Sequence, residues 1–171
     1  PKILNYYERD KFDYAGGAGG HMDILCYPFA RGRLFLEQEI DNNQYDDDAP
    51  CFWASGTAIM VRKEFFLEVE KFDENFFAHM DEIALCWRLQ LKGHNIYVNP
   101  KSVIYHKNAV SLPMTSIKKF MLNHRNSLMM LLSNYKVLTT LYLFPIRYML
   151  ELVAILYALT KLDFRHMFGV I

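Results

Sequence analysis

The stretch FFAHMDEIALCWRLQLKG, residues 76–93, is where the class of the fold is decided. Residues 81–92 are predicted to form a helix, which Gly93 ends at the usual C′ position. Its first two residues, Asp81 and Glu82, are adjacent acids in an otherwise apolar and aromatic frame. They either stabilise the helix start by up to about 1 kcal/mol, or form a catalytic base with a raised pKa. Their position alone is compatible with both interpretations.

The neighbouring segments predict an α/β pattern. Residues 56–61 (GTAIMV) are predicted to form a short apolar strand, and residues 62–72 a short amphipathic helix. Residues 95–100 and 102–106 are two further strand-like runs, separated by Pro100 and Lys101. We therefore expect a small mixed sheet, formed by residues 56–61 and 95–106 and covered by the two helices.

The chain divides by composition into two expected domains. Residues 1–113 would form an α/β domain, with a loop-rich region over 1–50 and a core over 51–113. Residues 114–171 would form a helical extension, with one helix over 116–135 and a long apolar one over 137–160.

The segment 137–160 is long enough to cross a bilayer. However, Pro145, Arg147 and Glu151 interrupt its middle, where charges are costly. We expect it to lie on a membrane surface or to pack on a partner rather than to span the bilayer. A helical hairpin that merely dimerises is the alternative.

The overall composition excludes some function classes. The 171 residues carry no net charge, so there is no cationic excess for binding nucleic acid. The three cysteines, Cys26, Cys51 and Cys86, form no CxxC motif, which argues against a disulfide framework or a zinc site and favours a reducing cytoplasm. The first residues do not have the pattern of a signal peptide.

Residues 52–111 resemble the second half of the catalytic domain of family 2 (GT-A fold) glycosyltransferases, and rhamnosyl- and galactofuranosyl-type members look most similar. The matching positions, in chain order, are Gly56, Arg62, Phe72, Asp73, Glu74, Phe76, Phe77, Asp81, Glu82, Leu85, Trp87, Arg88, Leu89, Gly93, Tyr97 and His106. The resemblance implies the C-terminal half of a GT-A domain, with the nucleotide-binding half and its Asp-x-Asp motif elsewhere. The DDD run at Asp46–Asp48 stands on the wrong side of this pattern and is interpreted as a solvated loop.

The resemblance also implies roles for individual residues. The acidic pair supplies the base that deprotonates the acceptor hydroxyl, with Glu82 as the base and Asp81 orienting it. The usual order of the two acids is reversed here, so either can be the base. The family often has a further acid where this chain has Ala84, four residues before Arg88.

A lone histidine at a strand end, such as His106, is commonly structural. The resemblance instead implies that His106 binds the divalent metal, Mn²⁺ or Mg²⁺, that holds the donor diphosphate in the full-length enzyme. Residues expected near the substrates form a second set, in which Trp53 would stack on a sugar and Arg125 would hold a diphosphate. This set is Trp53, Ser55, Gly56, Thr57, Arg88 and Arg125. Close packing at Gly56 and a solvated helix face at Arg125 are the alternatives.

The expected function is part of an inverting glycosyltransferase of bacterial cell-surface polysaccharide synthesis. It would transfer a sugar from a nucleotide-diphosphate sugar to a glycan or lipid-linked acceptor, in the cytoplasm and peripherally on the inner membrane. The fragment alone is expected to be inactive and to self-associate as a homo-oligomer. A membrane-proximal interaction or dimerisation module without chemistry is the alternative.

Overall fold

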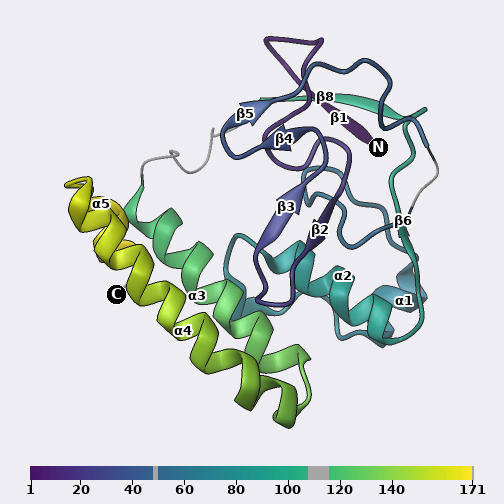
Figure 1. The fold of residues 1–171 in the computed structure, drawn as a ribbon. Helices are drawn as coiled ribbons and strands as arrows, with labels where there is room; N and C mark the ends of the chain where they lie inside the picture. Colours follow the sequence, from purple (N-terminus) through teal and green to yellow (C-terminus); the bar gives the residue numbers. More distant parts are fainter. Residues whose placement is uncertain (48–49, 108–115, 171) are drawn as a thin grey trace. The chain divides into compact units, whose positions relative to one another are not determined.

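The computed structural model describes residues 1–47, 50–107 and 116–170, as a mixed α/β chain with small sheets and C-terminal helices (Figure 1). The described chain forms two compact units. Unit 1 comprises Pro1–Met22, Pro28–Asp73 and residues 81–107, and unit 2 comprises Asp23–Tyr27, Glu74–Met80 and residues 116–170. The expected domain boundary at 113/114 lies outside the described residues.

The strands of the described residues are short and form two-stranded ladders. The pairs are β1 (Lys2–Asn5) with β8 (Val103–His106), β2 (Gly20–Met22) with β3 (Pro28–Ala30), β4 (Arg33–Leu34) with β5 (Glu37–Gln38), and β6 (Pro50–Cys51) with β7 (Ile96–Tyr97). The helices are α1 (Lys63–Glu68), a 3₁₀ turn at Glu74–Phe76, α2 (Asp81–Leu91), α3 (Ile117–Asn134), α4 (Val137–Thr160) and α5 (Phe164–Val170).

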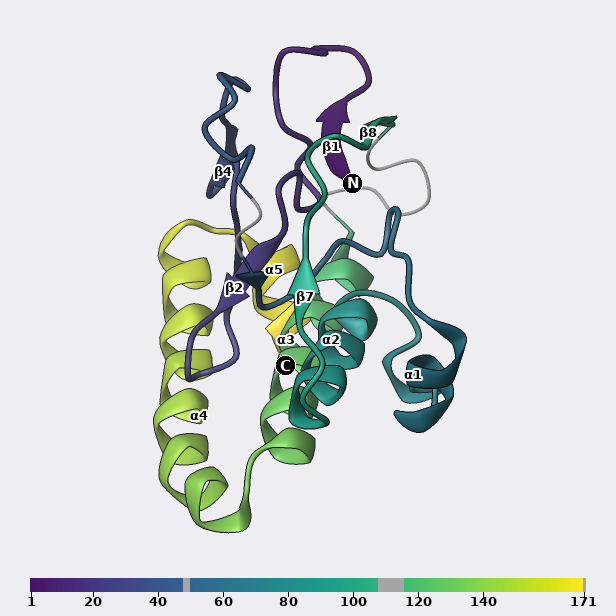
Figure 2. The ribbon, with the colours of Figure 1, turned by 90° about the vertical axis from the view of Figure 1, so that its right-hand side faces the viewer.

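The parallel pair of β1 and β8 joins the two ends of unit 1, and the two strands lie side by side in Figures 1 and 2. Its register runs from Lys2 opposite Val103 to Asn5 opposite His106. The expected strand at 102–106 is thus confirmed. Its partner is β1, within the region predicted to be mainly loops.

The predicted strand at 56–61 is wrong. The chain turns there, with the Ala58 amide bonded to the Ser55 carbonyl at 3.2 Å. Met60 is 96 % exposed, so the apolar run does not form one buried face. The single mixed sheet is wrong as well, because β7 pairs with β6 and β8 pairs with β1. A short apolar run does not by itself supply a ladder partner.

The helix α2 agrees with the sequence prediction and supplies much of one core of unit 1. Leu85 and Leu89 pack with Val69 in a buried cluster. Gly93 follows the helix at φ +89°, the left-handed conformation that favours glycine. The helix α1 is shorter than predicted and ends at Glu68.

Left-handed residues end α1 early. Glu70 and Lys71 have φ values of 61° and 66°. The Arg88 guanidinium of α2 donates to the carbonyls of Val69 and Lys71, both at 2.6 Å. Val69 is the C-cap residue of α1, so the first bond satisfies a carbonyl that a helix end leaves without an intrahelical partner, and the second binds the chain two residues further on.

The N-terminal part of unit 1 has its own small core around Leu4 and Phe12. Lys2 is buried and makes ion pairs with Asp41 at 2.7 Å and Asp46 at 2.5 Å. Asp47 pairs with Arg31. Asp46 and Asp47 of the DDD run therefore form ion pairs that hold this loop to the N-terminal part of unit 1.

Unit 2 is helical. The predicted helices at 116–135 and 137–160 are confirmed as α3 and α4, and α4 continues through Pro145. The helix α5 was not predicted, and it packs on both α3 and α4. Gly169 of α5 permits this packing, because a Cβ atom there would lie 2.4 Å from the Phe120 Cβ.

Candidate functional site

The two acids singled out in the sequence form the first turn of α2. Both side chains are half-buried in unit 1. This position suits negative charge, because the helix macrodipole is positive there. It is also where a catalytic carboxylate can be held rigidly, so the environment of each acid must distinguish the two roles.

Glu82 has the environment of a base. Burial, followed by the charge of Asp81, raises the pKa of Glu82 from 4.5 to about 7. A hydrogen bond from the Gly56 backbone opposes that rise. Gly56 also packs against this side chain, since a Cβ atom on Gly56 would lie 3.3 Å from the Glu82 Cβ. A carboxylate with a pKa near 7 can accept a proton at neutral pH and release it again.

The segment just before α2 is conformationally strained. Phe77, His79 and Met80 have φ values of 62°, 66° and 65°. Each left-handed residue of this kind costs on the order of 1 kcal/mol and needs support from its surroundings. Two side chains of α3 supply that support within unit 2.

Asn126 of α3 is fully buried, and its Nδ2 donates to the carbonyls of Phe76 at 3.0 Å, Ala78 at 2.8 Å and His79 at 2.7 Å. The neighbouring Arg125 donates from Nη2 to the carbonyls of Asn75 at 2.7 Å and Phe76 at 3.1 Å. Both residues bind the backbone of the segment that leads into Asp81. The expected contact of Arg125 with a diphosphate stays a prediction.

His106 ends β8 in unit 1, and its Nδ1 lies 3.1 Å from the Oδ1 of Asp13. Asp13 is completely buried, and its Oδ2 has no hydrogen-bond partner among the residues that the structure describes. The same Oδ1 accepts the Ala15 amide at 2.8 Å, which fixes the carboxylate in place. A carboxylate on one ring nitrogen orients the imidazole and leaves Nε2 to bind another group.

Trp53 has a different environment from the one expected for sugar stacking. It is 5 % exposed, and its Nε1 donates to the His21 carbonyl at 2.9 Å. A Cβ atom on Gly20 would lie 2.2 Å from the indole, and one on Gly16 would lie 2.5 Å from it. The indole ring therefore packs inside unit 1 against two glycines, and its expected stacking on a sugar stays a prediction.

The other residues expected near the substrates are partly placed by local bonds. Ser55 is buried, and its Oγ accepts the Thr57 amide at 3.3 Å. Arg88 binds the backbone at and beyond the end of α1, as described above. The binding roles of these residues stay predictions.

The glycine-rich loop at residues 13–20 connects the parts of this region. Asp13 at its start contacts His106, and Gly16 within it packs on Trp53, with a Cβ there 3.6 Å from the Ser55 Cβ. Gly56, next to Ser55, packs on Glu82. A continuous series of contacts within unit 1 thus links the predicted metal ligand to the predicted base. We expect Glu82 or Asp81, His106 and Trp53 to converge on one concave face, and this expectation stays a prediction.

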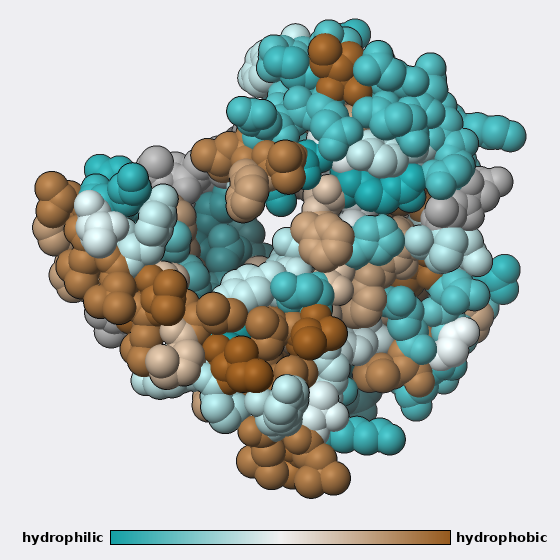
Figure 3. All heavy atoms as spheres, in the orientation of Figure 1, coloured by the Kyte–Doolittle hydropathy of each residue, from teal (hydrophilic) through white to brown (hydrophobic). Residues whose placement is uncertain are grey.

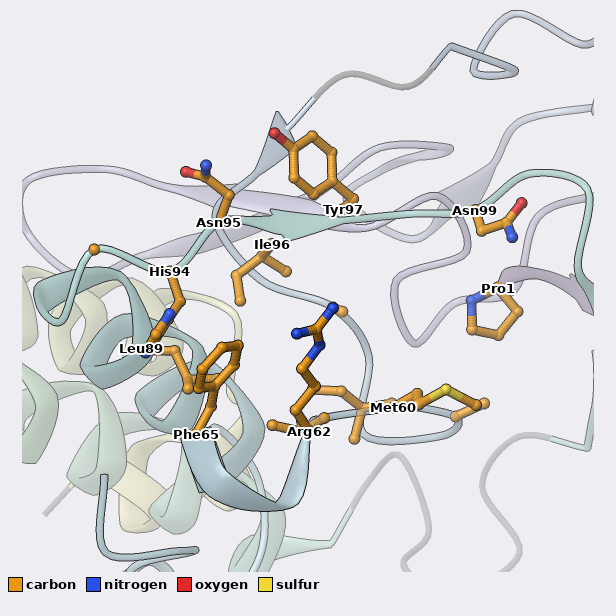
Figure 4. A pocket seen from close by; sticks show the side chains of 15 residues that line it. Pro1, Met60, Arg62, Phe65, Leu89, His94, Asn95, Ile96, Tyr97 and Asn99 are labelled. Carbon is orange, nitrogen blue, oxygen red and sulfur yellow. The ribbon is translucent and has the colours of Figure 1, made fainter. Parts of the chain in front are cut away.

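A cavity of about 470 Å³ lies in unit 1, and Ala54 and Ala58, on either side of the Ser55–Thr57 segment in sequence, are among its lining residues (Figure 4). In Figure 4 the Arg62 side chain points toward the strand that carries Ile96 and Tyr97, with Phe65 on one side of it and Asn99 on the other. Its walls include Ala54 but neither acid of α2 and not His106. The cavity is therefore separate from the predicted catalytic residues.

A metal ion is implied only by the resemblance. Among the described residues there is no group of three or more His, Cys, Asp or Glu side chains that could hold one. The Asp13–His106 pair fits the role of a single histidine ligand with its supporting carboxylate. The oxygen atoms of a bound diphosphate would then have to complete the shell.

Two residues of this region were missed by sequence reasoning. Asp13 lies 93 residues from His106, and no spacing rule connects them. Asn126 is not among the residues expected from the sequence, because a side chain that binds backbone carbonyls has no partner in the sequence pattern.

Comparison with known proteins gives a distant and partial similarity to a glycosyltransferase. The chain is 36 % identical over 61 residues to N-acetylglucosaminyl-diphospho-decaprenol L-rhamnosyltransferase of Mycobacterium tuberculosis, in strains CDC 1551 and H37Rv. This rhamnosyltransferase is a family 2 glycosyltransferase. The match covers 35 % of this chain and 20 % of the relatives, so the chain spans about a fifth of their length. No protein-family model and no solved structure matches the chain.

Proposed function

We propose that this chain carries the base and acceptor side of an inverting glycosyltransferase of the GT-A type. The observation that carries the proposal is Glu82, whose pKa is raised to about 7 at the start of α2, beside Asp81 and against Gly56. A residue that only stabilised a helix start would not need partial burial, which disfavours its charged form. The partial similarity to a rhamnosyltransferase supports the same reaction class.

The proposed chemistry is a single displacement. The Glu82 carboxylate takes the proton of an acceptor hydroxyl, and that oxygen attacks the anomeric carbon of the donor sugar. A new C–O glycosidic bond forms as the bond from this carbon to the nucleotide diphosphate breaks, and the diphosphate leaves with the electron pair. Asp81 keeps the local charge negative, which favours the proton on Glu82 after transfer.

His106 is proposed as the protein ligand of a divalent metal, Mn²⁺ or Mg²⁺, and Asp13 as the carboxylate that orients it. The metal would neutralise charge on the leaving diphosphate. The chain itself contributes the orientation of the imidazole, because the Asp13 Oδ1 is held by the Ala15 amide.

The name of the relatives suggests which probes to use. They transfer L-rhamnose to N-acetylglucosaminyl-diphospho-decaprenol. We propose a lipid-linked sugar as the acceptor class here and a nucleotide-diphosphate sugar as the donor class.

The test is sugar transfer by the longest natural protein that contains this sequence. The donor is nucleotide-diphosphate L-rhamnose, with a panel of other sugar nucleotides, and the acceptor is a polyprenyl-diphosphate N-acetylglucosamine. Glu82→Gln should reduce kcat by at least about 100-fold, while the matched control Glu64→Gln, in the first turn of α1, should leave it unchanged. Full activity in Glu82→Gln would favour the interaction module, in which the acids only stabilise the helix.

A further inference from the structure

The helix α4 of unit 2 has its charged residues on the inside. Arg147 is 1 % exposed and Glu151 is 4 % exposed, and they form an ion pair at 2.6 Å. Arg147 also donates to the Ser127 Oγ at 3.0 Å and lies 3.6 Å from the ring centroid of Tyr27. Glu151 lies 2.5 Å from the Nδ1 of His124. The charged side chains of this helix are thus bound within unit 2.

The remaining surface of α4 is apolar and exposed. At 100° per residue its exposed apolar side chains occupy one arc of about 220°, and the buried residues occupy the remainder. Those exposed residues are Val137, Leu138, Leu141, Tyr142, Ile146, Tyr148, Met149, Leu150, Leu152, Val153, Leu156, Tyr157 and Leu159. We call this arc the outer face of α4. Figure 3 shows the hydrophobic band that runs along the helices of unit 2.

The distribution of residues on α4 is the opposite of that on a helix at a water-exposed protein surface. A helix on a soluble protein normally turns its apolar stripe inward and its charged residues outward. A contiguous exposed apolar patch of this extent marks a surface that contacts something else.

The composition around the outer face identifies a lipid bilayer as the occupant. The helix has 24 residues with a mean hydropathy of 1.5, enough to cover about 36 Å of membrane surface. Exposed Lys136 and Lys161 flank its ends, and Tyr142, Tyr148 and Tyr157 are exposed along it. Lysines and tyrosines of this kind are typical of segments at a membrane–water interface.

The charge of the helical region matches an anionic membrane. Residues 116–170 contain seven Lys and Arg residues and two acids, Glu151 and Asp163. Arg147 and Glu151 are buried as a pair, whereas Lys136, Lys161 and Arg165 are exposed at the ends of α4 and just beyond it. Exposed basic residues near an apolar helix face are attracted by anionic head groups.

The polar residues of the neighbouring helix favour one orientation of α4 relative to the bilayer. The helix α3 packs beside α4 and carries Lys118, Lys119 and His124. If α4 crossed the bilayer, these polar residues and the Arg147–Glu151 pair would be drawn toward the hydrocarbon. If α4 lies in the interface plane, they stay on the protein side.

We propose that the outer face of α4 binds the surface of an anionic lipid bilayer, with the helix axis in the plane of the interface. The inward Arg147–Glu151 pair holds the helix to the rest of unit 2 and turns the apolar arc outward. This binding is independent of the proposed sugar transfer.

The test is flotation of the purified chain with lipid vesicles. One vesicle set is pure phosphatidylcholine, and the other contains three parts of phosphatidylglycerol in ten. The variant Leu138→Glu/Leu156→Glu changes two leucines at the centre of the outer face, which are 82 % and 61 % exposed. The matched control Leu34→Glu/Leu36→Glu changes two leucines of unit 1 that are 67 % and 75 % exposed. Circular dichroism and thermal melting check that both variants keep the fold.

The wild-type chain and the control should float with the anionic vesicles and bind neutral vesicles at least several-fold less. The α4 variant should bind at least about ten-fold less, because each leucine loses its apolar burial in lipid. Release by an alkaline carbonate wash would support the interface position, and retention would contradict it.

Three results would overturn the proposal. The first is a wild-type chain that does not float. The second is an equal loss of binding in the Leu34→Glu/Leu36→Glu control. The third is a wild-type oligomer that ignores vesicles and that Leu138→Glu/Leu156→Glu turns into a monomer, which would make the outer face a contact between copies of the chain.

Discussion

Replacing Asn126 should destabilise the protein more than its single amide group suggests. The two N–H groups of the Nδ2 of this buried side chain are shared among three backbone carbonyls, those of Phe76, Ala78 and His79. The Phe76 carbonyl keeps the Arg125 guanidinium as a donor, so Asn126→Ala leaves two carbonyls without this bond. Each lost bond of this kind costs about 1 kcal/mol where the group is only half-buried. Weaker support of the left-handed residues adds to that loss.

The expected total is about 2–3 kcal/mol, which corresponds to a fall in Tm of about 5–10 °C for a chain of this size. Asn126→Asp should cost at least as much, because its carboxylate has no N–H group to donate and would face three carbonyl oxygens. The matched control is Asn134→Ala, near the end of the same helix, where the Nδ2 donates within α3 to the Met130 carbonyl. This control should cost about 0.5 kcal/mol.

Urea unfolding followed by circular dichroism measures these free energies, and unchanged m values would show that the same transition is compared. Equal losses in Asn126→Ala and Asn134→Ala would refute the reasoning. An Asn126→Asp protein as stable as the wild type would refute it as well, because it would show that the N–H donors are not what holds the segment.

Three further predictions concern single residues of unit 1. Because the pKa of Glu82 rises from 4.5 to about 7 on folding, the unfolded chain ionises first, and stability falls between these pH values. Glu82→Gln should therefore stabilise the protein by up to about 3 kcal/mol at pH 8 and by almost nothing at pH 4, whereas Glu64→Gln should show no such difference in pH-dependent urea unfolding. Asp13→Asn should weaken Mn²⁺ binding about 10–100-fold, measured by paramagnetic broadening of the His106 imidazole signals, and unchanged broadening would contradict it. Gly93→Ala should cost about 1 kcal/mol of stability, since its φ is +89° and a Cβ atom would meet nothing within 4 Å.

The long helices could be predicted from the sequence because their periodicity extends over many residues. α3 and α4 have 18 and 24 residues, and their predicted bounds agree with the structure within about one residue. β6 and β7 have two residues each, too few to show an alternation. The pairing of β1 with β8 joins segments at opposite ends of unit 1, and no local pattern specifies such a partner.

The candidate site was predictable to a similar extent. The positions of Asp81 and Glu82 at a helix start followed from the sequence, because a helix N-terminus has local signals. The pairing of Asp13 with His106 did not, since it depends on the tertiary path of the loop after β1. The bonds of Arg88 likewise end on backbone carbonyls, and any residue type can supply a carbonyl.

The backbone between α1 and α2 provides a further test of whether Glu82 is a catalytic base or only stabilises the start of α2. Glu70, Lys71 and three residues of the segment 77–80 are left-handed without being glycine. A chain that needed only a stable helix start could use an unstrained connection, so this strain suggests that the position of α2 serves another purpose. If it serves to hold Glu82 out of water, loosening the segment should undo the raised pKa.

Asn126→Ala should therefore lower the pKa of Glu82 from about 7 toward 4.5, because a less tightly held first turn of α2 lets water reach the carboxylate. The pKa is measured by following the Glu82 side-chain ¹³C signal in an NMR titration of each folded variant. Asn134→Ala should leave it unchanged. If the pKa of Glu82 stays near 7 while Asn126→Ala lowers the stability as expected, the bonds of Asn126 hold the fold but not the acid. The strain would then have to be explained without the catalytic role.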